Sequence, residues 1–179
     1  MHRFVPCDGC HAFVFKSVRP FGKDFMSTSD TLLQPVRARA VADGLPYAGA
    51  VTPAQAWQLL CESPTAILVD VRTNAERDWV GRVTIPAPQH LAVEWSHYPG
   101  AAPNSHFVLQ LEALADKSAV ILFLCRSGVR SRYAATLATQ SGYASCFDIL
   151  EGFEGDRDST GHRKTIGGWC YAGLPWIGA

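Results

Sequence analysis

Ala119-Val120-Ile121-Leu122-Phe123-Leu124, followed directly by Cys125-Arg126-Ser127-Gly128-Val129-Arg130, is the stretch that decides the fold class of this chain. Six consecutive apolar residues are typical of a strand that is buried on both faces in a parallel sheet. Residues 131–141, which come next, are rich in small side chains, and Gly142 then provides a C-terminal helix cap. The stretch predicts a buried strand, a short loop and a helix that packs closely on a sheet.

Two other segments are expected to be strands. Residues 66–71, with the sequence Ala-Ile-Leu-Val-Asp-Val, share the apolar character of this strand, and residues 144–150 follow the Gly142 cap as a further strand. Apolar runs of this length need cover on both faces. We therefore expect all three strands to lie inside one sheet.

Three sites before and between these strands predict helix starts. Thr52-Pro53 combines an N-cap with a proline at the first helical position, and Thr73 and Glu76 have the spacing of a capping box. Asn104 is the expected cap of a helix over residues 104–115. Because strands and helices alternate, the predicted fold class is α/β, with a mostly parallel central sheet flanked by helices on both faces.

The composition excludes several classes of protein. The chain has 179 residues, and its 16 Lys and Arg balance its 16 Asp and Glu, so no overall charge attracts nucleic acid or an anionic membrane. No apolar run approaches the roughly 20 residues that span a bilayer, and no secretory signal is recognisable. We expect a cytoplasmic protein without nucleic-acid or membrane partners, in which the six cysteines are thiols.

The pattern divides the chain into three segments. Residues 1–45 have no sustained hydrophobic period and predict a leader that is disordered or mis-started. The polar run after Met26 is typical of a protein N-terminus, so the first 25 residues could come from translation that starts upstream of the natural start. Residues 46–155 carry the core pattern and predict the catalytic domain. Residues 156–179 are first polar and then aromatic, and we expect them to be an extension packed over the edge of the sheet.

Two groups of residues could in principle bind haem or a metal, and we expect that neither does. Cys7-Asp8-Gly9-Cys10-His11 matches the short pattern of haem attachment, but no helical segment surrounds it, so we interpret the match as chance. The histidines at positions 90, 97 and 106 lack the spacing of metal ligands, and we expect no metal site.

Cys125 stands where open α/β folds place their ligands, directly after a buried strand and just before a helix. A loop that turns from strand into helix directs backbone N–H groups at one point, and the helix N-terminus adds partial positive charge. Three arginines nearby, Arg126, Arg130 and Arg132, should further favour a thiolate and attract an anionic substrate. The pattern predicts a nucleophilic cysteine.

From about residue 51 to residue 150 the sequence resembles the rhodanese superfamily. The resemblance rests on the following stretches: Leu68-Val69-Asp70-Val71-Arg72 with Glu76, Gly81-Arg82-Val83 leading to Ile85-Pro86, Phe123 through Ser131, and Gly142-Tyr143 with Glu151-Gly152-Phe153-Glu154-Gly155. Arg82 is a departure, because many relatives have histidine after this glycine. The departure puts in doubt the family role of that imidazole and leaves the cysteine chemistry unaffected.

The resemblance implies a sulfurtransferase with Cys125 as the catalytic residue. Its thiolate would take sulfur from thiosulfate or a similar small anionic donor, hold it as a persulfide, and pass it to a thiol or to a protein acceptor. No metal or organic cofactor is implied. The substrate-binding residues would be the rest of the loop: Arg126, Ser127, Gly128, Val129, Arg130 and Ser131.

Asp70 and Arg72 end their strand on the same edge of a parallel sheet as Cys125. In rhodanese-like proteins the matching acidic and basic residues brace the active-site region, so they could stand behind the loop. The other interpretation, which we favour, is a structural cluster of Asp70, Arg72 and Glu76 that stabilises the fold.

Two alternative functions stay open. A non-catalytic rhodanese-like binding or regulatory module would have the same fold, although such modules tend to lack the cysteine. A cysteine-loop phosphatase or arsenate reductase resembles Cys-x5-Arg, whereas this loop is Cys-x4-Arg with Ser131 at the sixth position after Cys125. The shorter loop favours a cradle for one sulfur atom over one for a tetrahedral oxyanion.

Overall fold

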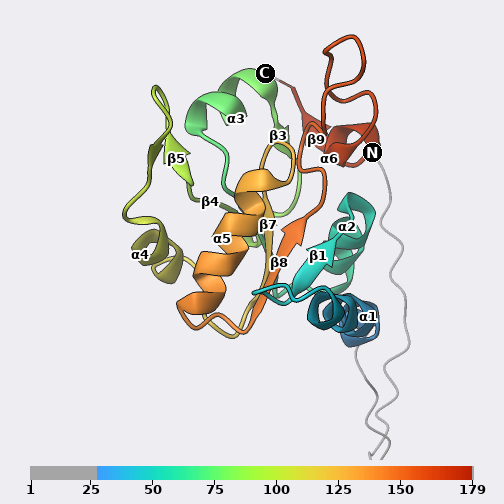
Figure 1. The fold of residues 1–179 in the computed structure, drawn as a ribbon, viewed down its shortest axis with the longest axis vertical. Coiled ribbons are helices and arrows are strands. Elements are labelled where there is room, and N and C mark those ends of the chain that lie inside the picture. The colour runs from blue at the N-terminus through green and yellow to red at the C-terminus, as the bar shows by residue number, and fades with distance from the viewer. Residues whose placement is uncertain (1–27, 179) are drawn as a thin grey trace, which may run out of the picture.

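The computed structural model describes residues 28–178, and its centre is a five-stranded sheet in which every pairing is parallel (Figure 1). This confirms the predicted α/β fold class. In spatial order the strands are β1 (Gly49–Val51), β8 (Ser145–Ile149), β7 (Val120–Leu124), β2 (Ala66–Asp70) and β4 (His90–Ala92).

The three strands predicted from the sequence are the three inner strands β8, β7 and β2, each a residue or two shorter than expected. Asp70 of β2 is the register partner of Leu124 of β7, so the two strands end side by side. Because all neighbours are parallel, the loops that follow β2, β7 and β8 emerge at one edge of the sheet, at the top of Figure 1.

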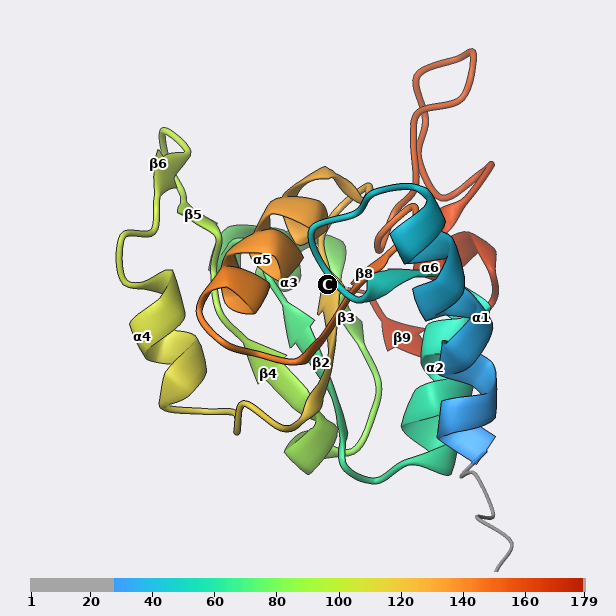
Figure 2. The ribbon, with the colours of Figure 1, turned by 60° about the horizontal axis from the view of Figure 1, so that its bottom comes forward.

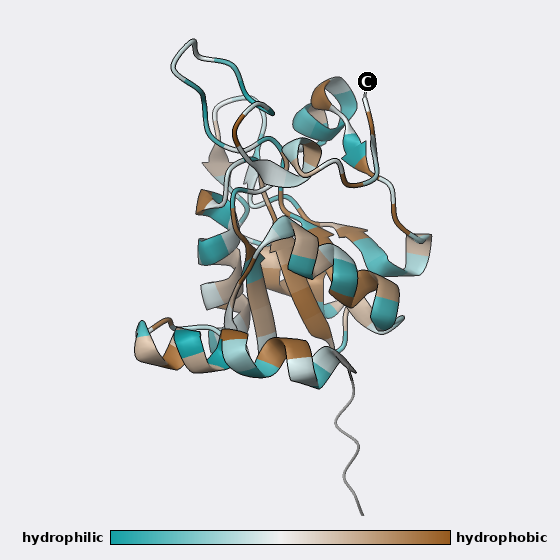
Figure 3. Ribbon diagram, turned by 90° about the vertical axis from the view of Figure 1, so that its right-hand side faces the viewer, coloured by the Kyte–Doolittle hydropathy of each residue, from teal (hydrophilic) through white to brown (hydrophobic). Residues whose placement is uncertain are grey.

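Helices cover both faces of the sheet, as predicted, and Figure 2 shows the two layers. On one face lie α1 (Thr28–Ala42), α2 (Pro53–Glu62) and α6 (Gly168–Tyr171), whose buried residues form one core cluster with the sheet. On the other face lie α4 (Phe107–Glu112) and α5 (Val129–Gln140), which form the second cluster. Figure 3 shows the strands as hydrophobic ribbons enclosed by helices with hydrophilic outer sides.

The small elements lie around the carboxyl edge and the flanks of the sheet. They are α3 (Asn74–Val80), β3 (Arg82–Val83), the 3-10 turn η1 (Ala87–Gln89), the hairpin strands β5 (Ser96–His97) and β6 (Ala102–Pro103), and β9 (Trp176–Ile177). Among the described residues, no helix is long and apolar enough to cross a membrane.

Local sequence signals fixed two of the helix starts. Thr52 caps α2 in a reciprocal box with Gln55, and Thr73 does the same with Glu76 at the start of α3. Ala134, Ala135 and Ala138 of α5 are fully buried, which lets this helix lie close to the sheet.

The helix predicted over residues 104–115 is shorter than expected. The structure has it only from Phe107 to Glu112, with His106 at the N-cap position. The Asn104 side chain is engaged elsewhere: its Nδ2 donates to the carbonyl of Glu94 at 2.7 Å, and its Oδ1 accepts from the His106 amide. Asn104 therefore anchors the chain before the helix instead of capping it.

Helix α1 lies inside the segment predicted to be a leader. Leu33, Val36 and Ala40 are buried, at a helical spacing that places all three on the sheet side. Pro35 within the helix interrupts the local signal, so periodicity alone did not reveal it. The expected start at Met26 and the Cys7 to Cys10 motif lie outside the described residues.

The C-terminal segment packs onto the domain with its aromatic residues. Trp169 is fully buried, meets Trp57 of α2 edge to face at 6.1 Å, and donates from Nε1 to the carbonyl of Pro175 at 3.0 Å. β9 pairs antiparallel with β3. The segment is thus packed on the domain, against α2 and the strand β3.

Substituting Trp169→Ala should lower the free energy of unfolding by about 3–5 kcal/mol, because it removes a fully buried indole from the core. Urea denaturation followed by circular dichroism measures this change. Trp79, which is 70% exposed, provides the matched control, and Trp79→Ala should cost less than about 1 kcal/mol. Equal losses in the two variants would contradict the packing described for the C-terminal segment.

Candidate active site

The side chain of Cys125 lies at the base of the loop between β7 and α5. Its sulfur accepts a hydrogen bond from the backbone N–H of Gly128 at 3.1 Å, and the Ser131 hydroxyl lies 3.4 Å away. The residue is only 1% exposed, and Ser131 is fully buried. The Gly128 N–H and the Ser131 hydroxyl therefore both contact the buried sulfur.

Gly128 gives the loop its shape. Its φ of +87° lies in the left-handed region, and an added Cβ would come within 3.2 Å of the Glu151 backbone nitrogen. Helix α5 starts at the next residue, two positions earlier than the sequence predicted. The positive end of the α5 dipole consequently faces the loop that carries Cys125.

Two backbone hydrogen bonds fix the first half of the loop from outside. The N–H of Phe153 donates to the carbonyl of Cys125 at 2.8 Å, and the N–H of Glu154 donates to the carbonyl of Arg126 at 2.9 Å. Gly152 permits this approach, since a Cβ there would lie 2.5 Å from the Cys125 carbonyl oxygen. With its carbonyls held outward, the loop can turn its amides toward the sulfur.

These two hydrogen bonds form a clamp on the loop, and the C-terminal segment supports this clamp. The N–H of Trp169 donates to the carbonyl of Gly152 at 2.8 Å, and the N–H of Gly168 donates to the Glu151 carboxylate at 2.7 Å. Residues 151–154 are thus hydrogen-bonded on one side to the cysteine loop and on the other to α6. The extension predicted beyond residue 155 is part of the support of the site.

Arg130 is paired with Glu76 of α3. Its two terminal guanidinium nitrogens donate to the two carboxylate oxygens at 2.8 and 2.6 Å, in the two-pronged geometry that Arg favours. Burial alone would raise the pKa of Glu76, but hydrogen bonds from Arg130 and Thr73 outweigh it and lower the pKa to about 2. The pair fixes α3 to the loop across 54 residues of sequence.

Asp70 and Arg72 form a buried ion pair behind the loop. Both side chains have no exposed surface, and Arg72 donates to both Asp70 oxygens and to the carbonyl of Gly81 at 3.0 Å. The Arg72 guanidinium also lies 4.0 Å from the centre of the Phe153 ring. This geometry agrees with the structural interpretation of the two residues, and it links them to the clamp through Phe153.

The structure separates the three arginines that the sequence grouped around the thiol. Arg130 is held by Glu76, and the charge of Cys125 contributes to its raised pKa after the Glu76 bonds, against the opposing effect of burial. Arg132 lies with its Nε 3.8 Å from Asp148 on the far side of the loop. Arg126 is exposed and lines the hollow above the loop.

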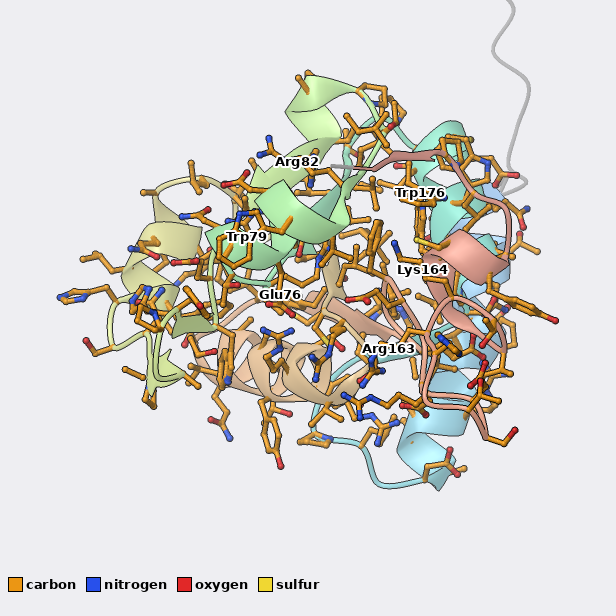
Figure 4. All side chains as sticks on the ribbon, turned by 90° about the horizontal axis from the view of Figure 1, so that it is seen from above. Glu76, Trp79, Arg82, Arg163, Lys164 and Trp176 are labelled. Atoms are coloured by element: carbon orange, nitrogen blue, oxygen red, sulfur yellow. The ribbon has the colours of Figure 1, made fainter. Side chains whose placement is uncertain are left out.

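A hollow of about 430 Å³ opens above the loop. Three parts of the chain surround it: the start of α3, the β5–β6 hairpin and the cysteine loop. Figure 4 looks down on this edge of the sheet and shows Glu76 between α3 and α5. The lining residues are Thr73, Glu76, Ser96, His97, Tyr98, Ala101, Arg126 and Arg130.

Asp148 is a buried carboxylate beneath the loop that the sequence did not reveal. It is the register partner of Phe123, two residues before Cys125, and it has no exposed surface. Among the described residues neither carboxylate oxygen has a partner within normal hydrogen-bond geometry, and the Tyr47 hydroxyl and the Arg132 guanidinium are the nearest polar groups that act on it. Burial raises the pKa of Asp148 to about 6, against the opposing effects of the Tyr47 hydroxyl and the Arg132 charge.

The described residues contain no group of three or more His, Cys, Asp and Glu side chains that could hold a metal ion. His97 pairs with Glu94 at 2.9 Å, and His106 lies at the start of α4. Two cysteines lie within the apolar segments of α2 and β8, where packing would be the ordinary expectation. Cys146 is buried in β8, whereas Cys61 of α2 is exposed.

The rhodanese-like domain model matches residues 52–158 of the chain. The chain belongs to the rhodanese-like family. Among curated relatives, the thiosulfate sulfurtransferase GlpE of Haemophilus influenzae is 34% identical over 127 residues, which cover 70% of this chain and 90% of the relative. An uncharacterized protein of Rickettsia rickettsii is 36% identical over 68% of this chain and 91% of its own length. These matches support membership of a sulfurtransferase family.

Solved structures give the same fold. The protein Rv0390 of M. tuberculosis superposes with a TM-score of 0.66 at 41% identity, over 73% of this chain and 98% of its own. The polysulfide-sulfur transferase homodimer of Wolinella succinogenes has a TM-score of 0.52 at 17% identity, over 86% of this chain and 90% of its own. The second match is a likeness of fold alone.

Glu76→Gln should lower the free energy of unfolding at pH 7 by about 1–3 kcal/mol, because it leaves Arg130 without its carboxylate. The pKa of Glu76 is lower in the folded protein, so its contribution is complete above about 4.5 and is lost as the pH falls toward about 2. Urea titrations across this range should show the two proteins converging. The exposed Glu62→Gln is the control and should differ little from wild type at any pH.

Asp148→Asn should raise the free energy of unfolding at neutral pH by about 1–3 kcal/mol. The folded-state pKa of about 6 lies above the ordinary 3.8, so the native protein loses stability as the pH rises between these values. The variant should lack that decline, and the two proteins should match below about pH 4. Thermal melts at several pH values measure the difference, with Asp43→Asn on the exposed end of α1 as control. A variant less stable than wild type at pH 7 would mean that the ionised carboxylate stabilises the fold.

Proposed function

We propose that this chain transfers sulfane sulfur from thiosulfate or a similar donor to a thiophilic acceptor through a persulfide on Cys125. In the first step the Cys125 thiolate attacks the outer sulfur of thiosulfate. The new S–S bond forms as the bond inside thiosulfate breaks, and sulfite leaves with the electron pair. The products are Cys125–S–S⁻ and sulfite, and no redox cofactor enters the balance.

In the second step an acceptor nucleophile attacks the outer sulfur of the persulfide. Cyanide would leave as thiocyanate, and a thiolate would leave as a persulfide, while Cys125 returns to its thiolate form. Two substitution steps at sulfur replace one direct transfer, and the protein holds the sulfur between them.

The observation that carries the proposal is the hydrogen bond from the Gly128 N–H to the Cys125 sulfur at 3.1 Å, in a loop that opens helix α5. The same donors can stabilise the developing charge on sulfur when it is attacked or released, because they are already oriented by the clamp at Phe153 and Glu154. The GlpE relative, named a thiosulfate sulfurtransferase, agrees with this chemistry.

The two alternatives have weaker support. A phosphatase or arsenate reductase would need room for a tetrahedral oxyanion, whereas here Ser131 lies 3.4 Å from the sulfur and Arg130 is held by Glu76. A non-catalytic module would not need the cysteine or a donor aimed at it. Both features favour catalysis by Cys125.

Cys125→Ser should abolish sulfur transfer while the fold is retained, because a hydroxyl fits the same space and cannot form a persulfide. A thiosulfate:cyanide assay that follows thiocyanate, together with circular dichroism, measures both properties. Cys61→Ser removes an exposed thiol on α2 and serves as the matched control with wild-type turnover. Transfer at the wild-type rate in the Cys125 variant would exclude the proposed mechanism.

A further inference from the structure

The hollow above the loop is larger than an inorganic sulfur donor needs. Its volume of about 430 Å³ lies within the ~300–1,000 Å³ of pockets that hold organic ligands. Thiosulfate is a single tetrahedral ion, comparable in size with a few water molecules of about 30 Å³ each. Most of the hollow would stay unfilled by such a donor, so its shape suits a larger molecule.

Of the charged side chains that line the hollow, all but one are paired with another side chain of the described residues. Glu76 and Arg130 neutralise each other through two hydrogen bonds, and His97 is paired with Glu94 outside the hollow. Arg126 lines the same space, and its guanidinium makes no hydrogen bond or ion pair within residues 28–178 of the structure. A ligand that fills the hollow therefore meets one exposed guanidinium, which binds carboxylates well.

The opposite wall is apolar and comes from the β5–β6 hairpin. Tyr98 and Ala101 line the hollow, and Tyr98 meets Trp79 of α3 edge to face, with ring centres 5.6 Å apart. Both rings are largely exposed, Tyr98 at 62% and Trp79 at 70%. Exposed aromatic rings beside a cavity offer apolar contact to the carbon skeleton of a ligand.

We infer that the acceptor is a small organic thiol bearing a carboxylate, held with its carbon skeleton against Tyr98 and its carboxylate on Arg126. This inference rests on the proposed function and names the substrate class of its second step. The acceptor thiolate attacks the outer sulfur of the Cys125 persulfide, the S–S bond to Cys125 breaks, and the acceptor leaves as R–S–S⁻. The electron pair of the broken bond stays on the Cys125 thiolate.

The test compares two thiols of similar size in a single turnover. The full-length protein is loaded with thiosulfate, freed of excess donor, and its added sulfur is recorded by intact mass spectrometry. It is then mixed with 3-mercaptopropionate, which carries a carboxylate, or with 2-mercaptoethanol, which is neutral. The loss of sulfur over time gives a second-order rate constant for each thiol, expressed per thiolate.

The ratio of the two rate constants should favour the carboxylate thiol by about three- to tenfold in the wild type. In Arg126→Gln the ratio should fall to about one, and in Arg126→Lys much of the preference should remain. Arg39→Gln makes the same charge change on the exposed side of α1, away from the loop, and should keep the wild-type ratio. The ratio is independent of changes in cysteine reactivity, because both thiols meet the same persulfide.

The aromatic wall provides a second variant in case Arg126→Gln fails to load sulfur. Tyr98→Ala should raise the half-saturating concentration of 3-mercaptopropionate severalfold, whereas Tyr98→Phe, which keeps the ring, should not. A wild type that loads sulfur but discharges it equally to both thiols would contradict the inference and leave the proposed function standing. A wild type that never gains sulfur would overturn the proposed function, and the inference with it.

Discussion

The pair of backbone hydrogen bonds from Phe153 and Glu154 to the carbonyls of Cys125 and Arg126 is the constraint on which the site depends. A short loop between a strand and a helix has polar groups on both its sides. When the carbonyls are satisfied from outside, the amides are free to point inward at the sulfur. The Gly128 N–H at 3.1 Å from Sγ is the visible result.

The rest of the structure holds that clamp in place. Phe153 stacks on the guanidinium of the buried Arg72, which Asp70 binds, so the exits of β2 and β8 are joined behind the cysteine. The carbonyl of Gly152 accepts from Trp169, which ties the C-terminal segment to the same point. Substitutions at these supports act on the chemistry only through the position of the loop.

Sequence reasoning predicted the features that local signals encode. Apolar runs predicted the inner strands β7 and β2, the segment after the Gly142 cap predicted β8, and capping signals predicted the starts of α2 and α3. The position of Cys125 between a buried strand and a helix was also predicted. Sequence reasoning missed what depends on contacts between distant residues. No local pattern around Glu76 indicates its pairing with Arg130. The proline inside α1 interrupts the helical pattern of that segment. The burial of Asp148 follows from its register with Phe123 in the sheet. The arginines were grouped by proximity in sequence, whereas the fold separates them.

The most direct test of the central claim is the intact mass of the protein after incubation with thiosulfate and removal of excess donor. The account predicts a gain of one sulfur atom, located on Cys125 by peptide mapping, lost on treatment with cyanide and absent in Cys125→Ser. A wild-type protein that gains no mass, or that gains the sulfur on another of its cysteines, would contradict the claim that this loop is built to hold a persulfide.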